Sequence, residues 1–178
     1  TSRLISAGVD SARLDVLVLL EDELQKDRAW LLTHAEQLID ALSLEKLANQ
    51  IEKRCTHIPL AYIRRCSEFY GREFYINRHV LTPRPESESM ITLLKNTLAN
   101  SRPLSPTSPK KTLSMRPRIA DVGTGSGALA ISTALEIPKS IVTACDIDTK
   151  CLRVAAKNAK MHDVQIEIFS GDLLRPLF

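Results

Sequence analysis

The stretch Ala120–Ser132, with the sequence ADVGTGSGALAIS, decides the fold class of this chain. The sequence RIADVG at 118–123 predicts a short buried strand, and the three glycines at 123, 125 and 127 predict a tight turn that opens a helix. Glycine lets the backbone approach a ligand closely because it has no side chain. The N-terminus of the following helix offers unpaired N–H groups and a partial positive charge. This stretch therefore predicts a binding site for a nucleotide-like cofactor.

The residues after this turn continue to alternate between helix and strand patterns. Two helical stripes and two further strands are expected: a stripe at Ala128, Ile131 and Leu135, a strand at 140–147, a stripe at 152–159 and a strand at 164–171. Strands that alternate with helices imply a parallel sheet with right-handed crossovers. We therefore expect an α/β fold in this part of the chain.

The part of the chain before this stretch shows other patterns. Leucines at helical spacing around residues 17–24 and 44–51 predict two amphipathic helices that pack on each other, with Trp30 in the same small core. The sequence EFYGREFYI predicts a β-hairpin with its turn near Gly71. The expected domains are a helical domain at 1–67, a hairpin with a connecting helix at 68–99, a Ser-, Pro- and Lys-rich linker at 100–117 and the sheet at 118–178.

Composition narrows the classes of protein that fit. The 178 residues carry a net charge of only +3 with the basic residues spread along the chain, so direct nucleic-acid binding is not expected. No run of 18 apolar residues is present, so no membrane span is expected. The four cysteines form no C-x-x-C pair and have no clustered histidines, so no metal site is expected. Reduced thiols indicate the cytoplasm, although an organellar protein whose targeting segment was removed would look the same.

Two cofactors fit the glycine turn. The spacing Gly123-x-Gly125-x-x-Ala128 matches the dinucleotide fingerprint, whereas Gly123-x-Gly125-x-Gly127 matches the turn of enzymes that use S-adenosylmethionine. In both cases Asp146, at the end of the second predicted strand, would accept hydrogen bonds from the ribose hydroxyls. Spacing alone does not separate the two cofactors.

Asp121 favours S-adenosylmethionine. Asp121 lies two residues before Gly123, where a dinucleotide site usually has an apolar residue, and its carboxylate would suit the ammonium group of the methionine half. The alternative is that Asp121 only caps the turn. After the third predicted strand, Asp172 would accept from the adenine amino group and Leu173 would form an apolar wall, unless Asp172 serves as a helix N-cap.

Several motifs resemble the HemK/PrmC family of protein glutamine methyltransferases, in the family's order and over nearly the whole chain. The matching stretches are PLAYI at 59–63, EFYGREF at 68–74, VLTPRPESE at 80–88, DVGTGSGALAI at 121–131, ACDID at 144–148, NA at 158–159 and SGDLL at 170–174. The run PRPESE beside a helical N-terminal domain is the specific part, because the glycine turn is common to most enzymes that use S-adenosylmethionine.

The resemblance implies a fold, a reaction and a partner. The fold would be a helical domain and a hairpin followed by the first half of a Rossmann-like class I methyltransferase sheet. The reaction would methylate the glutamine side-chain amide in the Gly-Gly-Gln motif of class I peptide chain release factors, and residues 1–67 would help to dock the release factor.

The resemblance also assigns site residues. The methionine end of the cofactor would be held by Gly123, Thr124, Gly125, Ser126 and Gly127. Asp146 would hold the ribose, and Leu173, after Asp172, would border the adenine. Residues 83–86 would shape the floor between the domains, where Arg84 either contacts a ligand or pairs with a nearby glutamate.

One family motif is missing from this sequence. The family has a fourth strand that ends in Asn-Pro-Pro-Tyr, and these 178 residues contain no such motif. An amide nitrogen is a poor nucleophile that must be held in line with the sulfonium methyl group, so we assign no catalytic residue. With three strands, the first would be an exposed edge. We therefore expect a fragment of a longer protein or a decayed gene product.

Other functions stay open on the sequence. One is a non-catalytic module that binds release factors through the helical domain. A second is an NAD-dependent enzyme, and a third is a methyltransferase that acts on another amide or amine.

Overall fold

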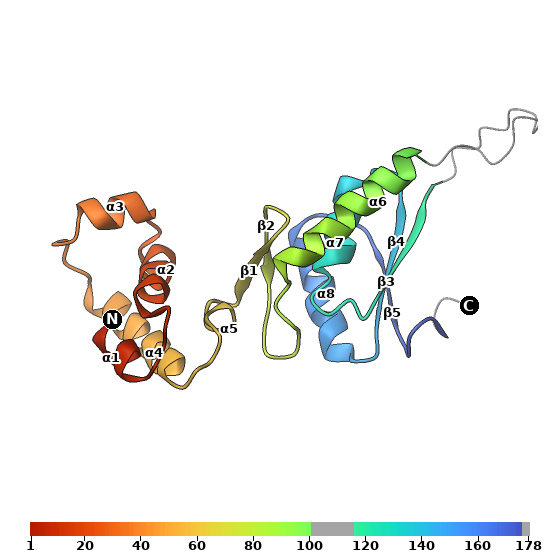
Figure 1. The fold of residues 1–178 in the computed structure, drawn as a ribbon. Coiled ribbons are helices and arrows are strands. Elements are labelled where there is room, and N and C mark those ends of the chain that lie inside the picture. Colours follow the sequence, from red (N-terminus) through yellow and green to blue (C-terminus); the bar gives the residue numbers. More distant parts are fainter. Residues whose placement is uncertain (101–115, 176–178) are drawn as a thin grey trace, which may run out of the picture. The chain divides into compact units, whose positions relative to one another are not determined.

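The computed structural model describes residues 1–100 and 116–175, and the chain divides into two compact units, Thr1–Arg65 and Cys66–Phe178 (Figure 1). The first unit is helical. The second unit contains a hairpin, a helix and an α/β sheet. The linker expected at 100–117 lies, except for its ends, outside the described residues.

Five helices form the first unit: α1 (Ser2–Ser6), α2 (Ala12–Leu24), α3 (Arg28–Thr33), α4 (Ala41–Cys55) and α5 (Leu60–Arg64). As the leucine spacing predicts, α2 packs on α4. The prediction for Trp30 is wrong, because α3 buries no residue and the Trp30 ring instead stacks on His34 at a centroid distance of 4.4 Å.

Ion pairs connect the helices of this unit. The acidic run of α2 pairs with bases on three other helices, in the pairs Glu21–Arg28, Asp22–Arg64 and Glu23–Lys46. The most buried pair joins Asp15 of α2 to Arg54 of α4, with Nε and Oδ2 2.6 Å apart. The Asp15 side chain is 6% exposed and that of Arg54 17% exposed, so neither group is well solvated.

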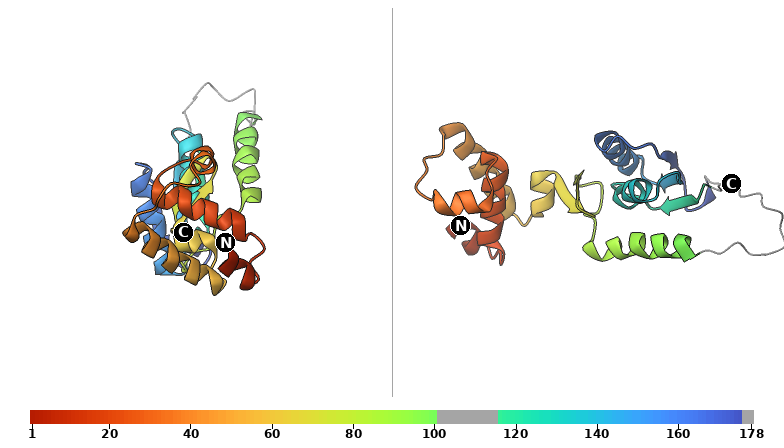
Figure 2. Two further views of the ribbon diagram at one scale, coloured as in Figure 1. Left: turned by 90° about the vertical axis from the view of Figure 1, so that its left-hand side faces the viewer. Right: turned by 90° about the horizontal axis from the view of Figure 1, so that it is seen from above.

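The second unit begins with a hairpin. It is formed by β1 (Cys66–Phe69) and β2 (Arg72–Tyr75), and η1 (Pro85–Ser87) and α6 (Glu88–Asn100) follow. The predicted hairpin is confirmed, with Tyr70 and Gly71 in the turn at φ 52° and 68°. Two positive φ values in a two-residue turn match the twist of a hairpin. Both views of Figure 2 show α6 as a rod beside the α/β layer.

The remaining elements confirm the α/β prediction. They are β3 (Arg118–Val122), α7 (Ala128–Glu136), β4 (Ile141–Asp146), α8 (Thr149–Met161) and β5 (Glu167–Ser170). The strands pair in parallel in the order β3-β4-β5, so β3 is an edge strand in the described part of the chain. The third strand begins later than expected, at Glu167, because the Val164 N–H caps α8 by donating to the Ala159 carbonyl at 3.0 Å.

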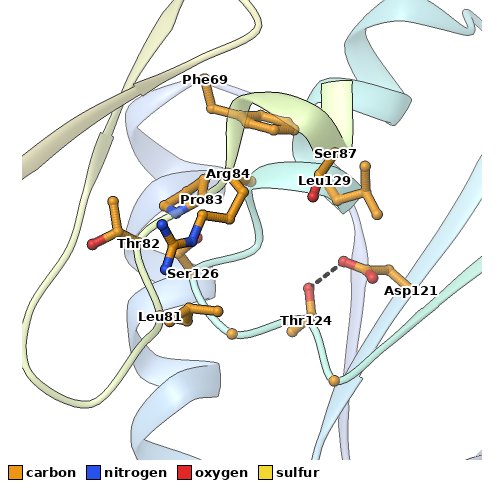
Figure 3. Close-up of a pocket in the computed structure, with 13 residues that line it drawn as sticks. Phe69, Leu81, Thr82, Pro83, Arg84, Ser87, Asp121, Thr124, Ser126 and Leu129 are labelled. Atoms are coloured by element: carbon orange, nitrogen blue, oxygen red, sulfur yellow. Dashed lines mark hydrogen bonds between the residues drawn. The ribbon is translucent and has the colours of Figure 1, made fainter. Parts of the chain in front are cut away.

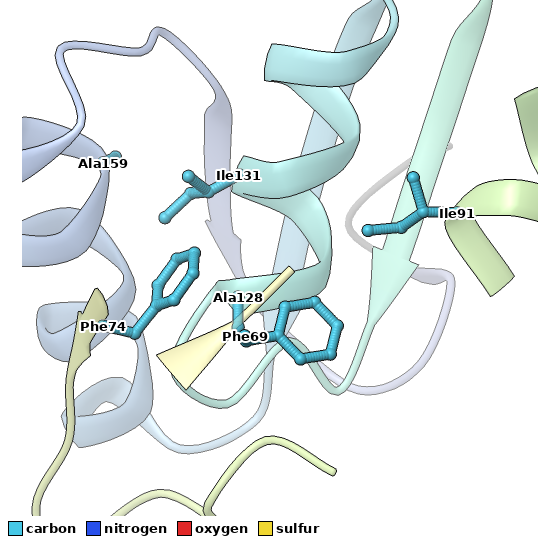
Figure 4. Close-up of a cluster of buried hydrophobic side chains, with 6 residues drawn as sticks. All are labelled: Phe69, Phe74, Ile91, Ala128, Ile131 and Ala159. Atoms are coloured by element: carbon cyan, nitrogen blue, oxygen red, sulfur yellow. The ribbon is translucent and has the colours of Figure 1, made fainter. Parts of the chain in front are cut away.

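A cluster of buried apolar side chains fixes the hairpin on the helices (Figure 4). Its members are Phe69 and Phe74 of the hairpin, Ile91 of α6, Ala128 and Ile131 of α7, and Ala159 of α8. Around it, Glu136 of α7 accepts from Arg72 of β2 at 2.8 Å and from Lys95 of α6 at 2.6 Å. Hydrogen bonds from Lys95 and Arg72 lower the pKa of Glu136. The hairpin and α6 are therefore both attached to α7.

Replacing Asp15 with Ala should destabilise the first unit strongly. The substitution leaves the Arg54 guanidinium poorly solvated and without its carboxylate, which costs about 3 kcal/mol of unfolding free energy. The matched control is Glu52→Ala, which removes an exposed pair with Arg3 and should cost less than about 1 kcal/mol. Urea unfolding of both variants measures the difference, and equal losses would show that the Asp15 pair adds nothing beyond a surface pair.

Candidate functional site

The glycine turn is fastened to the carboxyl edge of the sheet by backbone hydrogen bonds. The N–H groups of Gly123 and Thr124 both donate to the carbonyl of Cys145 at the end of β4, at 2.8 and 2.9 Å. The Gly127 N–H donates back to the Thr124 carbonyl at 2.9 Å and closes the turn. Open parallel sheets bind ligands at this edge.

The glycines of the turn have two different roles. Gly123 and Gly125 have φ of 76° and 55°, and a Cβ at either position would meet no atom within 4 Å, so only the backbone conformation favours glycine there. Gly127 has φ 76° and is buried, and a Cβ there would lie 3.0 Å from the Cβ of Ala155. Gly127 therefore allows α7 to start close against α8.

A cavity of about 180 Å³ lies between this turn and the segment that follows the hairpin (Figure 3). One wall consists of Phe69, Leu81, Thr82, Pro83, Arg84 and Ser87, and the other of Asp121, Gly123, Thr124, Gly125, Ser126, Ala128 and Leu129. We call it the Asp121 pocket. The structure thus brings together Asp121 and four residues of the predicted turn, whereas Gly127 does not line the pocket.

Asp121 is the acidic group of this pocket. Its Oδ2 accepts a hydrogen bond from the Thr124 hydroxyl at 2.7 Å. Burial raises the pKa of Asp121, the hydroxyl of Thr124 and the N–H of Ala130 lower it, and the nearby charge of Asp146 raises it further. The net shift is upward, so the surroundings in this ligand-free structure compensate the negative charge incompletely. A cationic ligand group would complete the compensation.

Arg84 supplies the opposite charge. In the described part of the chain it makes no ion pair with Glu86 or with Glu88, whose carboxylate accepts instead from the Tyr70 N–H at 2.8 Å. Figure 3 shows Arg84 and Asp121 on different sides of the cavity. The pocket therefore presents one cationic and one anionic side chain, which is the arrangement that a zwitterionic ligand group requires.

Asp146 lies next to the pocket and does not line it. Its Oδ2 accepts from the Gly125 N–H at 2.9 Å and its Oδ1 from the Asp148 N–H at 3.0 Å. Each carboxylate oxygen has a second lone pair, so Asp146 can still accept from two hydroxyl groups.

Asp172 and Leu173 lie at the same edge of the sheet in a separate hollow, which they share with Leu174 and Arg175. The side chain of Leu173 is 69% exposed, and its carbonyl accepts from the Sγ of Cys145 at 3.4 Å. The structure therefore places these two residues beside the carboxyl end of β4 and outside the Asp121 pocket.

Sequence reasoning missed residues in both walls of the pocket. Phe69, Leu81 and Leu129 line the pocket although no local pattern marks them as site residues. Pro83 and Arg84 line it as the floor prediction expected, but Pro85 and Glu86 do not. The run LTPRPES was the available signal, because the residue before each proline is kept extended, although Pro85–Ser87 then form the 3-10 helix η1.

The described residues lack both a metal-binding cluster and a membrane-spanning helix. They contain no group of three or more His, Cys, Asp or Glu side chains that could hold a metal ion. No helix in the described ranges has the length and apolar character needed to cross a bilayer.

The comparisons with known proteins agree with the division into two units. The family description PrmC N-terminal domain matches residues 1–64, and the description Methyltransferase small domain matches residues 101–178.

Among curated proteins, a release factor glutamine methyltransferase of Koribacter versatilis is 37% identical to this chain. The aligned region covers 95% of this chain and 56% of that relative. A bifunctional methyltransferase of Rickettsia bellii is 35% identical, and its aligned region covers 88% of this chain and 31% of that relative. The chain thus spans between 31% and 56% of the length of these relatives. Among solved structures, the ribosomal protein L11 methylase of Lactobacillus delbrueckii subsp. bulgaricus is 25% identical, with a TM-score of 0.38 over 53% of this chain and 42% of that one.

Gly127→Ala should destabilise the second unit more than Gly123→Ala does. Each substitution places a side chain at positive φ, at a cost of about 1 kcal/mol. At position 127 the new Cβ also meets Ala155 at 3.0 Å, and such overpacking adds about 2 kcal/mol. Chemical unfolding measures both variants, and equal losses would mean that α7 and α8 can move apart without cost.

Proposed function

We propose that this chain, which belongs to the HemK/PrmC family, binds S-adenosylmethionine in the Asp121 pocket and serves methylation of the Gly-Gly-Gln glutamine of class I peptide chain release factors. The observation that carries the proposal is the half-buried carboxylate of Asp121 beside the glycine turn, with Arg84 across the cavity. The methionine half of S-adenosylmethionine bears an ammonium and a carboxylate group, and these two side chains match them.

The remaining parts of the cofactor would be held by residues at the same edge of the sheet. Asp146 is proposed to accept from the ribose hydroxyls. Asp172 and Leu173 are proposed to border the adenine from their own hollow at this edge of the sheet. NAD fits the pocket less well, because neither of its ends carries an ammonium group for Asp121.

S-adenosylmethionine supplies an electrophilic methyl group on a sulfonium, and the protein must bring a weakly nucleophilic amide nitrogen into line with it. Acceptors for the amide N–H groups would have to come from outside the Asp121 pocket, and Asn-Pro-Pro-Tyr does not occur in these residues. We therefore assign no catalytic residue on this chain and limit its own proposed role to binding and orienting the cofactor.

The first unit is proposed to dock the release factor. The match of residues 1–64 to the PrmC N-terminal domain supports this role.

A reducing compartment, such as the cytoplasm or an organelle matrix, fits the absence of any disulfide among Cys55, Cys66, Cys145 and Cys151.

A transfer assay tests the proposed function. The whole product of the gene is incubated with radiolabelled S-adenosylmethionine and a class I release factor, and with the same factor carrying alanine in place of the Gly-Gly-Gln glutamine. Label should enter the first factor at least tenfold faster than the second. Binding of the release factor without any transfer would instead favour the non-catalytic module.

Asp121→Asn should raise stability and abolish tight cofactor binding. The raised pKa of Asp121 means that the folded chain binds its proton more tightly than the unfolded chain does, so the contribution of this group to stability falls as the pH rises through its folded pKa. The variant should therefore melt at a higher temperature than the unchanged chain at pH 7. The difference in melting temperature should vanish at acidic pH, where Asp121 is protonated. Loss of a charge-assisted hydrogen bond should weaken S-adenosylhomocysteine binding by about 10- to 100-fold.

Thermal melts from pH 4 to 8 and calorimetric titrations measure these two effects. Asp163→Asn is the control, because Asp163 is exposed after α8 and asparagine tolerates its φ of 49°. If Asp121→Asn melts at a lower temperature and still binds S-adenosylhomocysteine normally, Asp121 only caps the turn.

A further inference from the structure

Asn158 is a fully buried polar residue in the last turn of α8. Its side-chain exposure is 0%, and its amide makes three hydrogen bonds with good geometry. Oδ1 accepts from the Tyr75 N–H at 2.8 Å, and Nδ2 donates to the Tyr75 carbonyl at 2.9 Å and to the Ser126 carbonyl at 2.8 Å. Both N–H groups of the amide are therefore in use, and no other side chain of this size supplies two donors and an acceptor.

These bonds connect two separate segments. Tyr75 is paired with Cys66 on one side of β2, and the Asn158 amide binds its outward-facing backbone groups as a neighbouring strand would. The third bond reaches Ser126 in the glycine turn. A single side chain thus links the hairpin, which leads into the first wall of the Asp121 pocket, to the second wall.

The same face of α8 makes two more contacts with these walls. Residues 151, 155 and 158 are spaced so that they lie on one face of the helix. The Sγ of Cys151 donates to the His79 carbonyl at 3.0 Å, two residues before the first wall. Ala155 contacts Gly127, where an added Cβ would lie 3.0 Å away.

We propose that Asn158 is a positioning residue that sets the separation of the two walls of the Asp121 pocket and thereby its affinity for the cofactor. The inference rests on the proposed cofactor site and goes beyond it, because Asn158 neither lines the pocket nor would touch the ligand. Its effect passes through the Ser126 carbonyl to the turn and through Tyr75 to the segment that ends at Arg84.

His162 provides a matched control on the same helix. Its Nε2 lies 2.9 Å from the Glu73 carbonyl of β2, and its ring packs against Phe74 at a centroid distance of 4.7 Å. His162 therefore holds the hairpin on α8 as Asn158 does, but at the other end of the strand and without any hydrogen bond to the glycine turn in the described residues. Replacing either Asn158 or His162 with Ala should loosen the hairpin, whereas only the replacement of Asn158 should shift the glycine turn.

The test compares Asn158→Ala, Asn158→Gln and His162→Ala in the 178-residue chain, at a temperature where all three are folded. Calorimetry with S-adenosylhomocysteine should show at least a tenfold weaker Kd for Asn158→Ala, a smaller loss for Asn158→Gln, which keeps the amide, and less than a twofold change for His162→Ala. Equal losses for Asn158→Ala and His162→Ala, or an unchanged Kd for Asn158→Ala, would overturn the proposal.

Hydrogen–deuterium exchange on the ligand-free variants tests the same inference without the cofactor. The Gly127 N–H, bonded to the Thr124 carbonyl, should exchange at least tenfold faster in Asn158→Ala than in His162→Ala. Equal exchange would overturn the positioning role even if the cofactor binds. Failure of the unchanged chain to bind S-adenosylhomocysteine would overturn the proposed cofactor site instead, so the two failures can be told apart.

Discussion

The carbonyl oxygen of Cys145 accepts hydrogen bonds from the N–H groups of both Gly123 and Thr124, at 2.8 and 2.9 Å. These bonds hold the glycine turn where β3 ends beside β4, and they require the two strands to pair in the observed register, with Val122 opposite Cys145. A slip by one residue would turn Asp121 to the other face of the sheet. The pocket, the position of the Asp121 carboxylate and the start of α7 all depend on this pairing.

The first wall of the pocket depends on long-range packing. Phe69 and Phe74 place the hairpin among α6, α7 and α8, and this fixes where the chain enters the extended segment at 81–84. Glu136 adds an ionic connection, since it binds Arg72 of the hairpin and a lysine of α6. The hairpin therefore orients a segment whose own residues contribute little to the core.

How far the sequence could predict this site follows from the range of the interactions involved. The strand, the turn and the helix around Asp121 are set by local periodicity and glycine conformation, so their position could be predicted. Phe69 and Leu81 reach the pocket through contacts between distant segments, and no local pattern encodes such contacts. Trp30 shows the same limit, because an apolar residue in a short helix does not reveal whether a partner covers it. The roles of Asp172 and Leu173 stay predictions, since the ligand-free structure holds them in a separate hollow.

The most direct test of the account is a calorimetric titration of the unchanged 178-residue chain with S-adenosylhomocysteine and, in parallel, with NAD. A pocket with Asp121 on one side and Arg84 on the other should bind the amino-acid end of S-adenosylhomocysteine, at one site per chain, and should give no measurable heat with NAD. Binding of NAD without binding of S-adenosylhomocysteine would contradict the central claim and would assign the glycine turn to a dinucleotide.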